Sequence, residues 1–397
     1  AIFVGFVMGA FGGYLLAAQY TRSRLAALLG GIACAYFPQH VDQATEHLNL
    51  ASYWAMPLFL WAMVRSIRSG GRWWLATGLF FGLNALFSWH NALLSIPLGL
   101  ALALFETWRT DRPLQRVMLD LAGSALLAAV ILAPFFWPVL RDTLAGAAAL
   151  QKPFFDKPLD VAALLVPHPG HPLWGPLLTD LHVERRAYLS VGSIGYLGVV
   201  TLILACCSML SGRRRHFGES GPAAAVPRGA TVIWWLSFLF FLVLALGETL
   251  ESSLFGSPIS LALPWSWLQQ FELFGLVRIP NRFLLPAMLS LGVLAAMGGD
   301  RLVDRVAAAH VRFLIGILSL AMLFDYAWLP FPLRQNPSPE WLVELRAVSS
   351  PEAAILDIPL SHGPPGAFDS YLQTEHGRTI AGGYIASSFR PARQQLE

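Results

Sequence analysis

The residues best suited to chemistry lie in a short polar stretch between two apolar segments. Residues 37–50 contain no lysine or arginine but two carboxylates and two histidines, namely Asp42, Glu46, His40 and His47. A helix here would place Asp42 and Glu46, four residues apart, on one face with His47 beside them. Such a trio can hold a divalent cation or act as a general base with its orienting group. In the alternative interpretation, this is a solvated loop whose Glu46 only stabilises the N-terminal end of the next helix.

A second polar group follows in the turn Ser88-Trp89-His90-Asn91, between two later apolar segments. If this turn lies at the same depth as residues 37–50, then His90 and Asn91 join His47 and Asn49 as candidates for contact with a polar head group. The structural alternative is that these polar residues only make the turn.

The third group is Arg278-Ile279-Pro280-Asn281-Arg282, just before another apolar segment. Arginine is suited to bidentate recognition of phosphate, so Arg278, Asn281 and Arg282 are candidate substrate-binding residues. The alternative is that the two arginines anchor the chain at a membrane interface, with their charged ends extended toward water.

The composition indicates the elements that must position these groups. The chain of 397 residues is 55% hydrophobic and 13% charged, and its mean hydropathy is +0.55. Soluble domains carry about 25% charged residues. Apolar segments recur along the chain, and backbone polar groups in lipid must be satisfied within the segment, so we expect an all-α polytopic membrane protein. The ten predicted spans are 1–20, 25–37, 51–64, 73–89, 92–107, 119–140, 190–210, 231–248, 281–299 and 312–330.

Basic residues alternate between the connections. Fifteen of them fall in one set of loops, namely Arg22, Arg24, Arg65, Arg68, Arg72, Arg109, Arg112, Arg116, Arg213, Arg214, Arg215, Arg228, Arg301, Arg305 and Arg312. The opposite and longer set holds seven, namely Arg141, Lys152, Lys157, Arg185, Arg186, Arg278 and Arg282. Because positive residues favour the cytoplasmic side, the first set is predicted to be cytoplasmic and all three polar groups extracytoplasmic.

The predicted organisation is a transmembrane helical domain over 1–330, with outer loops at 38–50, 141–189 and 249–280, followed by an extracytoplasmic α+β segment over 331–397. A helix is expected at 339–345 and a strand at 353–358 in that segment. Since Ala1 already lies in an apolar run and the tail has no clear terminus, we expect a fragment truncated at both ends.

Several classes of function are disfavoured. The basic residues are distributed over loops as topology requires, so the net charge of +3 does not point to nucleic acid. Nucleotide-binding, hydrolase and zinc-protease motifs are missing from the sequence. His168 and His171 have the spacing of a metal pair but lack a third ligand nearby, so they are interpreted as residues of a structural loop.

Taken together, the motifs resemble a known family. They are Phe-Pro…His…His-Leu-Asn-Leu at 37–50, the His-Asn turn, Arg-x-Pro-x-Arg-Phe at 278–283, and a tail with Gln-Thr-x-His-Gly at 373–377 and Gly-Gly-Tyr at 382–384. This arrangement resembles bacterial membrane proteins of the GT-C glycosyltransferase superfamily over nearly the whole chain.

The resemblance implies transfer of a sugar from a polyprenyl-phosphate-linked donor at the extracytoplasmic face of the bacterial plasma membrane. It implies a main catalytic carboxylate in an outer loop that would precede Ala1, and a second acidic motif that matches 38–50. Asp42 and Glu46 are then the catalytic candidates, and their spacing departs from the usual Asp-x-Asp of a Mg or Mn site. The alternatives are a transporter or flippase of lipid-linked saccharides and a non-catalytic assembly factor for envelope polysaccharide.

Overall fold

The computed structural model describes residues 2–144, 159–178, 194–211, 229–250, 261–271, 277, 279–329, 339–350, 352–356 and 371–380. Within these ranges it leaves out the side chains of Glu46, Val139, Leu140, Asp142, Thr143, Leu144 and Val348. The chain divides into two compact units. The first comprises residues 1–141 and 154–331, and the second comprises 142–153 and 332–397.

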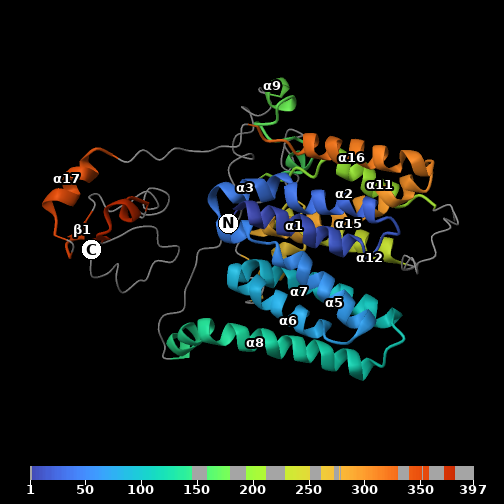
Figure 1. Cartoon of the computed structure of the whole chain (residues 1–397), viewed down its shortest axis with the longest axis horizontal. Coiled ribbons are helices and arrows are strands. Elements are labelled where there is room, and N and C mark those ends of the chain that lie inside the picture. Colours follow the sequence, from blue (N-terminus) through green and yellow to red (C-terminus); the bar gives the residue numbers. More distant parts are fainter. Residues whose placement is uncertain are drawn as a thin grey trace. The chain divides into compact units, whose positions relative to one another are not determined.

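The first unit is a helical bundle (Figure 1). Its longer helices are α1 (Ile2–Ala17), α2 (Arg24–Tyr36), α3 (Pro38–Glu46), α5 (Ala55–Ser69), α6 (Trp73–Phe87), α7 (Trp89–Arg109), α8 (Leu114–Leu144), α11 (Val199–Cys207), α12 (Ala230–Ala245), α15 (Leu284–Val303) and α16 (Val311–Asp325). Its short helices are α4 (Leu48–Ala51), α9 (Trp174–Leu177) and α13 (Trp265–Leu268), with 3-10 turns η1 (Val161–Leu164), η3 (Pro280–Phe283) and η4 (Ala308–His310).

The mostly helical architecture agrees with the expected fold class, but the number of spans does not. A helix occupies each of the ten predicted segments. Over the described residues, however, only four helical segments are long and apolar enough to cross a membrane, namely Trp89–Arg109, Leu114–Pro138, Pro280–Val303 and Ala308–Asp325. The other six helices, α1, α2, α5, α6, α11 and α12, run for 9 to 16 residues, whereas a span needs about 20. Hydropathy located these segments but did not set their helical lengths.

The core of the bundle is built around α15, whose apolar stretch is wholly buried. It packs against α2, α11 and α12. Glycine allows the α2–α15 approach: a Cβ added to Gly30 would lie 3.2 Å from the Gly292 carbonyl oxygen, and one added to Gly292 would lie 2.9 Å from Cys34 Sγ. This segment is therefore apolar because other helices surround it, whereas α8 leaves most of its apolar surface uncovered.

The stretch 38–50, predicted as an outer loop, is helical rather than irregular, because it forms the helices α3 and α4. Phe37 is extended, with φ −60° and ψ 142°, as residues before proline tend to be. Pro38 then starts α3, a position where its missing N–H costs nothing. The polar stretch is thus a fixed helical connection between α2 and α5.

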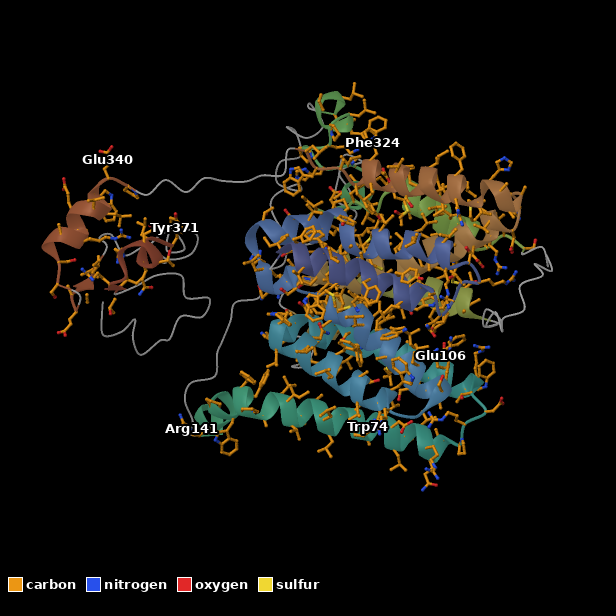
Figure 2. All side chains as sticks on the ribbon, in the orientation of Figure 1. Trp74, Glu106, Arg141, Phe324, Glu340 and Tyr371 are labelled. Atoms are coloured by element: carbon orange, nitrogen blue, oxygen red, sulfur yellow. The ribbon has the colours of Figure 1, made fainter. Side chains whose placement is uncertain are left out.

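The helices α1, α2, α5, α7 and α15 run between two polar ends. We call residues 19–23, 66–68, 106–112 and 300–304 the ion-pair end, because Arg68 contacts Glu106 and Arg22 contacts Asp304 there. We call residues 37–53, 88–95 and 279–285 the pocket end. In Figure 1, α3 lies at one end of the bundle, and Glu106, labelled in Figure 2, lies toward the other.

The second unit contains α17 (Trp341–Val348) and two short parallel strands, β1 (Ala354–Ile355) and β2 (Thr379–Ile380). The helix overlaps the stretch expected to be helical, and β1 lies within the stretch expected to be a strand. Arg378, just before β2, joins the end of α17 by donating from Nε to the Ser349 hydroxyl and from Nη2 to the Ser349 carbonyl, both at 3.1 Å.

Candidate functional site

Three segments that are far apart in the sequence meet at the pocket end. Gln39 Nε2 on α3 donates to the backbone carbonyl of Asn281 in η3 at 2.9 Å. Asn91 Nδ2, in the first turn of α7, donates to the Leu50 carbonyl at 3.1 Å. Between them lies a pocket with room for about one water molecule. Its lining residues are Phe37, Gln39, His40, Gln43, Leu50, Asn91, Leu94, Arg282 and Leu285.

One face of α3 carries the polar side chains of the site. Gln39, Asp42, Gln43 and Glu46 follow the spacing i, i+3, i+4 and i+7, which places them on a single helical face. Asp42, a predicted catalytic residue, is fully buried and does not line the pocket, whereas the two glutamines line it and are at least nine-tenths buried. The sequence prediction that Asp42 and Glu46 share a face therefore holds for the backbone, while the side chain of Glu46 lies outside the described residues.

The amide groups of this pocket present their oxygens as unused acceptors. The Gln39 and Asn91 nitrogens are committed to backbone carbonyls, so their amide orientations are fixed and the oxygens point elsewhere. Over the described residues, Gln39 Oε1, Gln43 Oε1 and Asn91 Oδ1 are buried and accept no hydrogen bond. A buried acceptor left in this state costs about 1–3 kcal/mol. The pocket thus holds three acceptors that a donor could satisfy.

Arg282 supplies positive charge to the same pocket. It belongs to η3, which starts at Pro280, and its half-buried side chain is part of the pocket lining. Asn281 beside it is buried, and its backbone rather than its amide receives Gln39. Arg278, the other predicted phosphate-binding arginine, lies outside the described residues.

His40 is held by the backbone on both sides of its ring. Nδ1 lies 2.6 Å from the Ala35 carbonyl oxygen and Nε2 lies 2.8 Å from that of Ala51. Phe6 and Tyr53 pack on the ring, with centroids 4.3 and 4.5 Å away. Burial lowers the pKa of His40, and the two carbonyl contacts oppose that shift without reversing it. His40 therefore joins α2, α3 and α4 by its ring contacts, and it is part of the pocket lining.

Three other predicted binding residues, like Asn281, do not line the pocket. The Asn49 side chain is exposed, and its contribution is a backbone carbonyl 3.5 Å from Asn91 Nδ2. His47 ends α3, where its backbone N–H donates to the Gln43 carbonyl. His90 stacks on Trp89 with ring centroids 3.7 Å apart. Of the predicted binding residues, the described structure thus brings Asn91 and Arg282 to one pocket.

In the described part of the chain, no three His, Cys, Asp or Glu side chains cluster in a way that could bind a metal ion. The His168–His171 pair is committed to loop structure, as expected. His168 Nδ1 accepts from the Gly170 N–H, and His171 Nδ1 accepts from Leu173 and Trp174, while its Nε2 lies 2.8 Å from the Phe324 carbonyl oxygen.

The comparisons with known proteins give a family and nothing closer. A family model described as a domain of unknown function, DUF6311, matches residues 1–323. That match covers most of the chain, so the chain belongs to this family. No curated protein and no solved structure matches the chain.

Proposed function

We propose that this chain is a membrane glycosyltransferase that takes a sugar from a polyprenyl-phosphate-linked donor at the extracytoplasmic face. The observation that supports it best is the convergence of α3, the start of α7 and η3 on one pocket, which combines Arg282 with amide acceptors. A sugar phosphate carries both an anionic group and hydroxyl donors, so this pairing suits it better than a purely anionic or purely apolar ligand.

In the proposed reaction, an acceptor hydroxyl oxygen forms a bond to the anomeric carbon of the donor sugar. The bond from that carbon to the phosphate oxygen breaks, and polyprenyl phosphate leaves with the electron pair. The acceptor proton passes to a carboxylate, the role we assign to Asp42 or Glu46. Arg282, together with Arg278, neutralises charge on the departing phosphate. A divalent cation, Mg or Mn, stays a separate proposal, and no step here depends on it.

The orientation of the protein forms part of this proposal. Arg22, Arg68 and Arg112 lie at the ion-pair end, and positive residues favour the cytoplasmic side of the bacterial plasma membrane. The pocket end and the C-terminal segment would then be extracytoplasmic. Apolar side chains that α8 leaves uncovered, including Leu126, Val130 and Phe135, would face membrane lipid and the polyprenyl chain.

Substitution of the carboxylates in the full-length protein tests the catalytic assignment. Asp42→Asn and Glu46→Gln should each lower sugar transfer from a polyprenyl-phosphoryl hexose by about 10²-fold or more if the residue is the general base. Asp111→Asn is the matched control, because Asp111 is exposed on the connection between α7 and α8. Normal transfer by both pocket-end variants would remove the catalytic role from this motif.

Binding of the carrier tests the phosphate contact separately. Arg282→Ala should weaken binding of a short-chain polyprenyl phosphate by about 1.5–3 kcal/mol, the usual value of a hydrogen bond to a charged group. An unchanged affinity would exclude Arg282 as the phosphate ligand. Binding of the sugar-bearing carrier without any transfer to water or added saccharide would favour a transporter or an assembly factor instead.

A further inference from the structure

We propose that Gln39, Gln43 and Asn91 form a subsite that recognises adjacent hydroxyl groups on one edge of the transferred sugar. This inference rests on the proposed function and extends it, because it assigns sugar recognition to three neutral amides rather than to the charged residues. The subsite would select hydroxylated sugars over deoxy sugars.

The first argument is the direction of the amides. Gln39 Nε2 is held by the Asn281 carbonyl and Asn91 Nδ2 by the Leu50 carbonyl, at 2.9 and 3.1 Å. Turning either amide over would place its oxygen against a carbonyl oxygen, so each oxygen is kept as an acceptor. Both oxygens, with Gln43 Oε1, accept nothing from the described residues.

The second argument is energetic. All three residues are at least nine-tenths buried, and each unsatisfied acceptor costs about 1–3 kcal/mol. Three such acceptors from two separate helices around one pocket are a substantial cost to the fold. A ligand that donates hydrogen bonds to them recovers this cost on binding, which makes the binding selective for donors.

The third argument concerns the class of donor. Ammonium groups, hydroxyl groups and amide N–H groups can all donate to carbonyl oxygens. Arg282 lines the same pocket, and its positive charge disfavours an ammonium ligand. The pocket has room for about one water molecule, so it admits a hydroxyl group at the edge of a sugar but not the whole ring. Neutral hydroxyl groups at the edge of a sugar fit both limits.

Four short-chain carriers tested on the purified full-length protein decide this inference. They are a polyprenyl-phosphoryl hexose, its 2-deoxy and 3-deoxy analogues, and polyprenyl phosphate without a sugar. In the wild type, loss of at least one of the two hydroxyls should weaken binding by about 10–100-fold. In Gln43→Met, the same deoxygenation should change affinity less than about 3-fold, because its acceptor is gone. Sugar-free polyprenyl phosphate should bind both proteins equally.

The outcomes separate this inference from the proposed function. If the wild type transfers the hexose but binds the deoxy carriers as tightly as the parent, the subsite is refuted and the function stands. An equal loss of affinity for all four carriers in Gln43→Met would also refute the subsite, because the residue would then act on the fold. Failure of every carrier to bind the wild type overturns both. Asn91→Ser is a second variant that repeats the test if Gln43→Met unfolds.

Discussion

The two polar ends of the helical bundle satisfy their buried groups in opposite ways. At the ion-pair end, Arg68 donates from Nε and Nη2 to both carboxylate oxygens of Glu106 at 2.7 Å, and the Tyr20 hydroxyl adds a third contact at 2.9 Å. At the pocket end, three amide oxygens lie buried without a donor among the described residues. The same helices, α2, α5, α7 and α15, connect an end whose buried carboxylate is fully hydrogen-bonded to an end whose buried amide oxygens accept nothing from the described residues.

The difference is one of arrangement as well as of number. The ion-pair end and its immediate surroundings also have buried atoms without a hydrogen-bond partner among the described residues, namely Ser66 Oγ, Arg65 Nε and Trp234 Nε1, and none of these residues lines the pocket. The acceptors of the pocket end belong to residues that line one space beside a guanidinium. The contacts of the ion-pair end thus stabilise the fold, whereas the unsatisfied acceptors of the pocket end are suited to binding a ligand.

The largest loss of unfolding free energy should come from breaking the ion pair between Arg68 and Glu106. Arg68→Ala leaves the carboxylate of Glu106, which is 1% exposed, without its guanidinium. Loss of one partner of a buried ion pair costs about 3–5 kcal/mol of unfolding free energy. Chemical denaturation of the purified protein in detergent would measure this loss.

The control for that change removes both charges. Arg68→Met with Glu106→Gln keeps an acceptor for Tyr20 and leaves no buried charge, so most of the lost stability should return. If the double variant is no more stable than Arg68→Ala, the ion pair does not set the stability of this end.

A smaller loss of unfolding free energy is expected when the hydrogen bond between α3 and η3 at the pocket end is removed. Gln39→Leu removes the contact between α3 and η3 that ends on the Asn281 carbonyl, at a cost of about 1–2 kcal/mol. Thermal unfolding would register the loss, and carrier binding should fall with it because Arg282 sits in η3. A variant with full stability and full binding would show that this contact does not hold the pocket.

Substitution of Gln43 should not lower the unfolding free energy. Its side chain makes no hydrogen bond to the described residues, so Gln43→Met removes a buried acceptor without breaking a contact. The unfolding free energy without ligand should stay the same or rise by about 1 kcal/mol, while sugar recognition is lost. A marked loss of stability would place Gln43 with the structural residues and weaken the contrast between the two ends.

The smallest expected effect is the pH dependence that His40 gives to the unfolding free energy. Burial lowers the pKa of His40, so the folded protein favours neutral imidazole, whereas a histidine in the unfolded chain has a pKa of about 6.5. Stability should therefore be complete above that pH and fall as pH drops below it toward the folded pKa. His40→Gln keeps a donor but does not titrate, so its unfolding free energy should depend less on pH between 5 and 8. Parallel pH curves for both proteins would contradict this.

The sequence predicted the helices better than their roles. Apolar runs located all ten segments, but hydropathy cannot separate a helix that faces lipid from one that other helices enclose, as α15 shows. Residues 38–50 were expected to be a loop because they are polar. Pro38 at the first helical position was the signal for α3, and the spacing of Gln39, Asp42 and Gln43 was the signal for its buried face.

The candidate site was predictable in part. Alternation of basic loops indicated that residues 37–50, 88–91 and 278–282 share one end, and the contacts from Gln39 to Asn281 and from Asn91 to Leu50 bring these segments together. Which side chains reach the pocket depends on helix orientation and on long-range packing. For that reason Gln39 and Gln43 were missed in favour of charged neighbours.

Photo-crosslinking tests the central claim most directly. A polyprenyl-phosphoryl hexose with a photoreactive group on the sugar, irradiated with the full-length protein, should label peptides from residues 37–50, 88–94 and 279–285. Excess unlabelled carrier should compete, and Arg282→Ala should reduce the yield. Labelling confined to the ion-pair end around Glu106, or labelling that unlabelled carrier does not reduce, would contradict the account.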